Sequence, residues 1–366
     1  MRLSKTPENT SRIVLGLSGG VDSATSAALL IEQGYQVIGV TARFVDDAAT
    51  NASIQAASEV AAFLGIEHIV WDATEVFERT VIVPFCDQCA QGQTPSPCVF
   101  CNRFCKIPVL LEVADAYDAA FVATGHYARR VFDPVTGRYA IAKANDTTKD
   151  QSYMLAQLTQ DQLARLVLPL GEWQKTDVRV FADEHELPVA HRAESQDLCF
   201  VPADYRDFLL ERGIADTPGK VELRDGSIVG EHQGLHRYTI GQRKGIGIAL
   251  GEPVFVVEKD VSRNVLVLAY KNDALISGLT TWPLTWQAGI EQYDCGQGDG
   301  IVCSVKIRYR SNAISARIFT ESDGCVTAVF DAAQTPTAPG QYAVFYQDDV
   351  VLGSAPIKSV VFVESR

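Results

Sequence analysis

The chain has 366 residues, 47% of them hydrophobic and 21% charged, which is typical of a globular protein of two or three domains with a buried core. Its formal net charge of −13 excludes a generally basic nucleic-acid-binding surface, so RNA binding would need a local basic face. The chain has neither an N-terminal apolar leader nor an apolar run of about 18 residues, so we expect a cytoplasmic protein without a membrane partner.

The first informative segment joins the apolar residues 13–15 to a glycine-rich turn and an alanine-rich helical pattern. A strand that turns through glycines into a helix N-terminus binds anions, because unpaired helix N–H groups face the ligand. No lysine follows the glycines, so this is not the GxxxxGK[ST] loop. The pattern SGGxDS instead resembles that of the PP-loop ATP pyrophosphatases, which predicts an ATP site. The predicted ATP-binding loop consists of Gly16, Leu17, Ser18, Gly19, Gly20, Val21, Asp22 and Ser23.

Up to residue 203, strand-like runs alternate with helical stretches, which predicts a parallel sheet with helices on both faces and a ligand at the carboxyl ends of the strands. The predicted strands are 37–40, 68–71 and 119–125. The predicted helices are 24–34, 53–64, 107–117, 162–167 and 177–185.

The chain contains nine cysteines and no secretory signal, so we expect reduced thiols that serve chemistry or metal binding. Five of them lie close together: Cys86, Cys89, Cys98, Cys101 and Cys105. The two CxxC pairs have the spacing of tetrahedral thiolate sites, and zinc, an iron–sulfur cluster and sulfur transfer all remain open.

The proline-containing segment before Cys101 predicts a helix that starts near Asn102. Cys101 would then lie at a helix N-terminus, with a lowered pKa and increased nucleophilicity. Cys295, Cys303 and Cys325 lie in β-like sequence and are expected to pack in the core.

After a short helix at 205–212, the pattern changes to short period-2 runs, which predict small antiparallel barrels or sandwiches. These runs are 220–223, 227–230, 253–259, 264–270, 301–310, 313–319, 326–330 and 342–346. As a strand, 306–310 would place Lys306, Arg308 and Arg310 on one face as a stripe that tracks phosphates.

The chain resembles the tRNA-specific 2-thiouridylases, the MnmA (TrmU) family, along essentially its whole length. The matching stretches are 16–23, 92–102, 123–130, 149–155, 195–200, 230–248, 306–310 and 339–346. The resemblance implies an α/β fold: a PP-loop (adenine nucleotide α-hydrolase-like) parallel-sheet domain over 1–203, a small linking domain over 204–277, and a C-terminal antiparallel β-barrel over 278–366 that contacts tRNA.

The resemblance also implies ATP- and Mg²⁺-dependent 2-thiolation of a tRNA wobble uridine (tRNAs of the Lys, Glu and Gln type). The uracil C2 oxygen would be adenylated, and sulfur would come from a cysteine desulfurase or a relay protein. Cys199 would carry a persulfide and Cys101 would form a transient disulfide with it. Ala42 and Gly125 would contact the nucleotide. The residues implied in tRNA contact are Ser96, Pro97, Cys98, His126, Lys149, Asp150, Gln151, Arg308, Tyr309 and Gln341.

Some residues depart from the family pattern. Many members have Asp at the position of Cys98, and a bulky apolar residue at that of Ala42, while Cys86, Cys89 and Cys105 lie outside the pattern. Cys98, Cys101 and Cys199 could instead hold a 4Fe–4S cluster that binds hydrosulfide. Two other functions stay open: a PP-loop amide-forming synthetase, which needs no paired cysteines, and a non-catalytic tRNA-binding protein stapled by metal, which needs no ATP loop.

Overall fold

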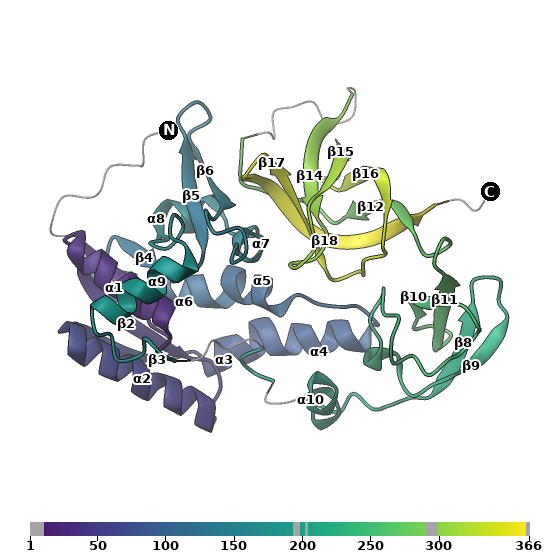
Figure 1. Cartoon of the computed structure of the whole chain (residues 1–366), viewed down its shortest axis with the longest axis horizontal. Helices are drawn as coiled ribbons and strands as arrows, with labels where there is room; N and C mark the ends of the chain where they lie inside the picture. The colour runs from purple at the N-terminus through teal and green to yellow at the C-terminus, as the bar shows by residue number, and fades with distance from the viewer. Residues whose placement is uncertain (1–10, 193–197, 202–203, 290–298, 364–366) are drawn as a thin grey trace.

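The computed structural model describes residues 11–192, 198–201, 204–289 and 299–363. Three sheets organise the chain, and the expected order of a parallel α/β domain, a small middle domain and a C-terminal barrel is confirmed (Figure 1). The first sheet is parallel, with the order β3-β2-β1-β4-β7. Its strands are β1 (Arg12–Gly16), β2 (Gln36–Arg43), β3 (Glu67–Asp72), β4 (Phe121–Ala123) and β7 (Leu166–Val167).

Helices cover both faces of this sheet, as predicted. Alternate residues of β1 point to opposite faces. Ile13 and Leu15 pack with residues of α1 (Val21–Glu32) and α2 (Ala48–Leu64), whereas Val14 packs with α6 (Ile107–Ala116). The strand order reverses between β1 and β4, which is the point where ligands bind in such sheets.

The other helices connect and flank these elements. They are α3 (Thr74–Phe77), α4 (Val83–Ala90), α5 (Pro97–Cys101), α7 (Ser152–Leu155), α8 (Gln160–Arg165), α9 (Lys175–Glu184) and α10 (Tyr205–Glu211). The predicted helix at 162–167 is therefore wrong in its last two residues, which form the parallel edge strand β7.

The helix predicted to start near Asn102 starts earlier. Pro97 occupies the first position of α5, where its missing N–H costs no hydrogen bond. A π-helical turn, Asn102–Lys106, then joins α5 to α6 without a break. Cys101 is thus inside a helical segment, and its predicted place at a helix N-terminus is wrong.

The middle sheet has the order β10-β11-β8-β9. Its strands are β8 (Gly219–Leu223), β9 (Ile228–His232), β10 (Val254–Asp260) and β11 (Val265–Tyr270). The pair β8–β11 is parallel and the others are antiparallel, so the sheet is mixed rather than purely antiparallel.

The C-terminal sheet closes into a barrel because β18 pairs with both β17 and β12. Its strands are β12 (Ile276–Thr281), β14 (Ile301–Lys306), β15 (Ile314–Thr320), β16 (Val326–Gln334), β17 (Tyr342–Gln347) and β18 (Val350–Phe362), with the short β13 (Thr285–Trp286) paired to β18. Cys303 is buried in the barrel core, as predicted, and Cys325 is also buried; Cys295 lies outside the described residues.

The strand β14 ends at Lys306, and residues 307–311 form a turn. The prediction that Lys306, Arg308 and Arg310 share one strand face is therefore wrong.

A hairpin that the sequence analysis did not predict, β5 (Ala128–Asp133) and β6 (Arg138–Lys143), leaves the α/β domain and extends the barrel sheet, where Ala142 pairs with Val350 (Figure 1). Within the described part of the chain, every helix is too short or too polar to cross a bilayer.

Candidate active site

The loop between β1 and α1 has the geometry of an anion-binding turn. Gly19 has φ +70° and packs so closely on α2 that a Cβ would lie 2.7 Å from Ser53 O. Ser23 Oγ accepts a hydrogen bond from Ser18 N (3.2 Å) and donates one to Gly20 O (3.0 Å). Gly20 caps α1 without a side chain, so no capping side chain occupies the first-turn N–H groups of the helix, which suits the binding of an anion.

Asp22, in the first turn of α1, has two partners from distant segments. Its Oδ1 accepts hydrogen bonds from Tyr127 Oη and from Lys175 Nζ, both at 2.6 Å. Lys175 is the first residue of α9, and its side chain is 10% exposed. The tertiary structure therefore brings a lysine to a loop that has none of its own. Sequence analysis missed this residue. The only related signal was that the loop contains no lysine, and this does not indicate which distant lysine would take its place.

Gly125 and His126 follow β4 and lie beside this loop. A Cβ on Gly125 would lie 3.1 Å from Ser23 N and 3.1 Å from the carbonyl carbon of Asp22, so only glycine allows this approach without a shift. His126 Nδ1 lies 2.8 Å from Thr124 Oγ1, and burial, together with the charge of Lys106, lowers the pKa of His126 to about 3. Ala42 lies in β2, the strand next to β1.

The thiols of Cys98, Cys101 and Cys199, predicted as site residues, affect one another's pKa. Cys98 and Cys199 reach solvent, yet the protein atoms crowded around Cys199 raise its pKa to about 11, and the neighbouring thiols of Cys101 and Cys98 add to this rise. Lys106, which the sequence analysis also missed, favours the thiolate of all three. The tertiary structure has thus brought together residues that lie about 100 positions apart.

The pKa of Cys101 is raised and not lowered. The thiol is 7% exposed, and its hydrogen bond with Cys105, followed by burial, raises its pKa well above the usual value. The lowered pKa belongs to Cys105, mainly because Cys101 donates to it. The predicted helix-terminus effect is absent because Cys101 lies inside the helical segment.

The tetrahedral thiolate site predicted from the two CxxC pairs does not form: among the described residues, no three His, Cys, Asp or Glu side chains are arranged to hold a metal ion. Cys98, Cys101 and Cys199 are among these residues, and the 4Fe–4S cluster that the resemblance allows for them stays a prediction. Cys86 and Cys89 lie on α4, and burial raises the pKa of Cys89 to about 12. Every cysteine in the described ranges is a free thiol.

The loop before α5, which leads to Ser96 and Pro97, is held by the other two domains. Thr94 N donates to Pro339 O (2.9 Å), and Gln341 Nε2 donates to Thr94 O (2.8 Å), both in the barrel domain. On the other side, a Cβ on Gly92 would lie 2.7 Å from a methyl of Val261, which follows β10. Gln341 therefore positions the loop through its side chain.

The remaining predicted tRNA contacts differ in accessibility. Asp150 is buried and accepts hydrogen bonds from its own segment, and Gln151 Oε1 accepts one from Tyr127 N (2.9 Å). Arg308 donates to the carbonyls of Ile240 and Pro336, which ties the middle domain to the barrel. Lys149 and Tyr309 are half-buried, and Arg310 is exposed. Burial raises the pKa of the Tyr309 hydroxyl, and the charge of the neighbouring Arg310 acts against this rise.

Comparisons with known proteins agree with this arrangement. Three family models match in order: the tRNA methyl transferase HUP domain at residues 11–203, the tRNA methyl transferase PRC-barrel domain at 206–270, and the aminomethyltransferase beta-barrel domain at 277–357. The chain is 41% identical to the tRNA-specific 2-thiouridylase MnmA of Solibacter usitatus, over 94% of this chain and 99% of that protein. It is also 41% identical to the MnmA of Trichlorobacter lovleyi, over 97% and 99%.

Among solved structures, the U34-tRNA thiolase NcsA from Methanococcus maripaludis with its [4Fe-4S] cluster aligns at 20% identity and a TM-score of 0.34, over 55% of this chain and 64% of that chain. This likeness is too weak to carry an argument about the reaction.

Proposed function

The chain belongs to the tRNA-specific 2-thiouridylase (MnmA) family and is a tRNA sulfurtransferase, and from this premise we propose how its residues divide the reaction. The HUP domain uses ATP. The loop residues Gly16 to Ser23 hold the phosphates through backbone N–H groups, with Gly125 and Ala42 along the nucleotide. Asp22 serves the Mg²⁺ end of ATP, and Lys175 supplies the positive charge that the loop lacks.

In the first step, the C2 oxygen of the wobble uridine attacks the α-phosphate of ATP, and pyrophosphate leaves. The uracil oxygen becomes part of an AMP ester and so becomes a good leaving group. His126 stays neutral at physiological pH because its pKa is held near 3. It therefore contacts the base or ribose as a neutral hydrogen-bonding group and not as a cation.

In the second step, the terminal sulfur of a persulfide on Cys199 attacks C2, and AMP leaves. Cys101 then attacks Cys199 Sγ, which releases 2-thiouridine and leaves a Cys101–Cys199 disulfide that a dithiol reductant opens. A cysteine desulfurase or a sulfur-relay protein reloads Cys199, whose exposed position suits this transfer.

The observation that supports this division best is the shared position of Lys106. Its charge acts on the thiols of Cys101 and Cys199 and on His126, and His126 follows the glycine that packs on Asp22. This supports the proposal that the thiols and the ATP loop are two parts of one site. A PP-loop amide-forming synthetase would have no use for these thiols, and a metal-stapled binding protein would need a metal site.

We propose that the tRNA lies over a surface to which Cys98 and Arg310 contribute exposed side chains. The half-buried members of this surface are Ser96, His126, Lys149, Gln151 and Tyr309. Pro97 is buried and would act by fixing the start of α5. Asp150, Arg308 and Gln341 would act through the segments that they hold. The preferred tRNAs would be those of the Lys, Glu and Gln type with a wobble uridine, in the cytoplasm. We derive no step through a 4Fe–4S cluster.

The test compares Cys101→Ser, Cys199→Ser and the control Cys325→Ser, since serine keeps the shape but carries sulfur poorly. We expect the first two variants to bind tRNA and release pyrophosphate but to form no 2-thiouridine in nucleoside mass spectrometry, whereas Cys325→Ser stays active. Full thiolation by Cys199→Ser, or activity that requires bound iron, would contradict the proposal.

A further inference from the structure

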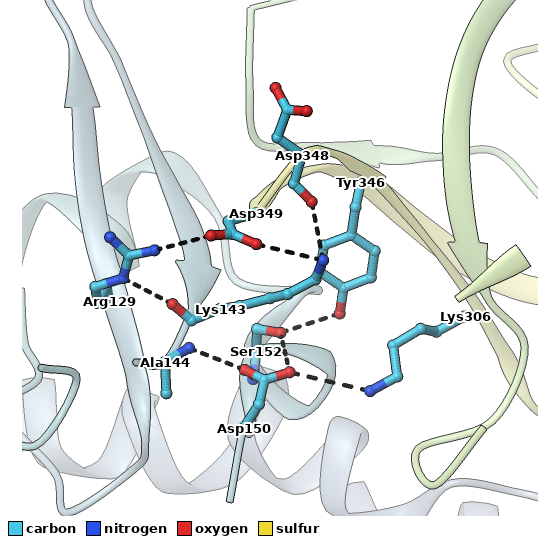
Figure 2. A network of polar contacts seen from close by, with 9 residues as sticks. All are labelled: Arg129, Lys143, Ala144, Asp150, Ser152, Lys306, Tyr346, Asp348 and Asp349. Atoms are coloured by element: carbon cyan, nitrogen blue, oxygen red, sulfur yellow. Dashed lines mark hydrogen bonds and ion pairs between the residues drawn. The ribbon is translucent and has the colours of Figure 1, made fainter. Parts of the chain in front are cut away.

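A buried polar cluster joins the α/β domain to the barrel at some distance along the chain from the thiols (Figure 2). Asp150 lies at its centre. Its Oδ1 accepts hydrogen bonds from Ala144 N and Ser152 N, both at 3.1 Å, and its Oδ2 accepts one from Ser152 Oγ at 2.9 Å. These bonds fold residues 149–152 into one defined turn between β6 and α7.

The barrel supplies two further side chains to this cluster. Ser152 Oγ lies 3.1 Å from Tyr346 Oη, and Lys306 Nζ lies 4.0 Å from Asp150 Oδ2. Ser152 and Tyr346 are completely buried. Removing Ser152 Oγ would leave the buried Tyr346 hydroxyl without this hydrogen bond, which costs more than the bond itself contributes. Removing the Tyr346 hydroxyl would leave Ser152 Oγ with its bond to Asp150 alone.

The barrel is also fixed on the side of the β5–β6 hairpin. Lys143 Nζ donates to Asp348 O (2.9 Å) and lies 4.9 Å from the centre of the Tyr346 ring (Figure 2). Asp349 forms ion pairs with Lys143 and Arg129, both at 3.5 Å. Tyr346 is thus held from two directions and presents its hydroxyl to Ser152 in a fixed position.

From residues 149–152 a short path leads to the ATP loop. Gln151 and Tyr127 are paired twice: Tyr127 N donates to Gln151 Oε1 (2.9 Å), and Gln151 N donates to Tyr127 O (2.7 Å). The hydroxyl of the same Tyr127 donates to Asp22 Oδ1 (2.6 Å). The backbone position of Tyr127, and therefore the reach of its hydroxyl, depends on the turn at 149–152.

We infer that Tyr346 and Lys306 of the barrel are positioning residues for Asp22: they fix the turn 149–152, which places Tyr127 on the Asp22 carboxylate. The inference rests on the proposed role of Asp22 in binding Mg²⁺–ATP. It explains why the contact between this turn and the barrel is polar, with Asp150 and Ser152 on one side and Tyr346 on the other. Apolar side chains would have been enough to pack the two domains together. The barrel then contributes to the ATP step without touching ATP.

The experiment measures Mg²⁺–ATP binding by calorimetry on the full chain, together with tRNA-dependent pyrophosphate release. For Tyr346→Phe we expect about a three- to tenfold weaker binding of Mg²⁺–ATP, the range that a lost buried hydrogen bond produces. The KM for ATP should rise by the same factor, and loading of Cys199 from a persulfide donor should not change. Lys306→Gln should shift ATP binding in the same direction.

Ser354→Ala is the matched control. Ser354 is a completely buried barrel residue that accepts a hydrogen bond from Gln157 Nε2 (2.7 Å) and donates to Ala156 O (2.8 Å). It therefore joins the same two domains at the far end of α7, outside residues 149–152. We expect this variant to lose stability but to keep its affinity for ATP. An equal loss of ATP affinity in Ser354→Ala would overturn the inference, because it would indicate general loosening of the interface.

A double-mutant cycle with Tyr127→Phe tests whether Tyr346 acts on ATP affinity through the Tyr127 hydroxyl or independently of it. We expect Tyr346→Phe to have little further effect on ATP affinity once the Tyr127 hydroxyl is absent. Additive losses, or unchanged ATP affinity in Tyr346→Phe, would refute the role of Tyr346. Failure of the proposed function would look different from failure of this inference. In that case the wild-type chain would bind Mg²⁺–ATP but would neither release tRNA-dependent pyrophosphate nor thiolate tRNA.

Discussion

At the scale of single residues, the surroundings of each side chain set its chemistry. His126 and Cys199 both lie near Lys106, and both are crowded by protein atoms. Crowding disfavours the charged form of each, so it lowers the pKa of the histidine and raises that of the thiol. The site therefore holds a neutral imidazole and a protonated thiol at neutral pH, which suits contact with an uncharged base.

His126 makes stability depend on pH in a defined direction. Its pKa is near 6.5 in the unfolded chain and about 3 in the folded protein, so between these values only the unfolded state binds the proton. The free energy of unfolding should fall as the pH drops through this window, by at most about 1.4 kcal/mol per pH unit from this group. Urea titrations at pH 7 and pH 5 should show a smaller loss for His126→Gln than for the wild type.

His191→Gln is the control for this measurement, because the His191 side chain is 92% exposed. Its loss of stability between pH 7 and pH 5 should match that of the wild type. If His126→Gln and the wild type lose the same stability, the His126 imidazole is not held neutral in the folded protein.

At the scale of elements, the proposed ATP loop depends on two places where backbone packs on backbone. The turn after β1 packs closely on α2 at Gly19, and the segment after β4 packs closely on α1 at Gly125. Both contacts lie at the switch point of the sheet, where parallel strands leave the crevice for a nucleotide. The strand order, rather than any one motif, brings the loop and His126 together.

Gly125→Ala tests the second contact. The added Cβ would lie 3.1 Å from Ser23 N and must displace the first turn of α1, so we expect roughly tenfold weaker Mg²⁺–ATP binding, in line with the cost of overpacking. Calorimetry gives the affinity. The control Gly137→Ala lies at the tip of the β5–β6 hairpin, where φ is +71° and a Cβ meets nothing within 4 Å. It should lose some stability but bind ATP normally, and an unaffected Gly125→Ala would show that the nucleotide does not depend on this contact.

At the scale of the whole molecule, an acidic chain has to bind a polyanion. The net charge of −13 leaves no general attraction for tRNA, so we expect affinity to come from a few local cations. Arg308 is a poor test of this idea, because it holds carbonyls of the middle domain and of the barrel together. Arg310 is exposed, and its charge reaches Tyr309.

Arg310→Gln should weaken tRNA binding regardless of sequence and reduce the slope of log affinity against log salt by about 1, as loss of one phosphate contact does. Filter binding at several salt concentrations measures both. Lys358→Gln is the control, since Lys358 is an exposed lysine of β18 that lies over the ring of Trp282. The same salt slope in Arg310→Gln and the wild type would exclude a phosphate contact at this position.

The sequence by itself determined the local elements and their order. The glycines and the apolar run around β1, the period-2 strands after residue 205 and the helical stretch of α6 are local patterns, because side-chain periodicity records which face is buried. The thiols and the SGGVDS loop were also evident from their residues alone, and the family resemblance that they carried is confirmed.

Only the tertiary structure decided which distant groups meet. Lys175 donates a hydrogen bond to Asp22, the charge of Lys106 acts on His126, and the β5–β6 hairpin joins the barrel, none of which leaves a local signal. It also decided the pKa of Cys101, because a helical segment that continues through the thiol removes the helix-terminus effect and buries the sulfur. Periodicity is a property of neighbours along the chain, whereas contacts, burial and charge environment come from packing between segments far apart in sequence.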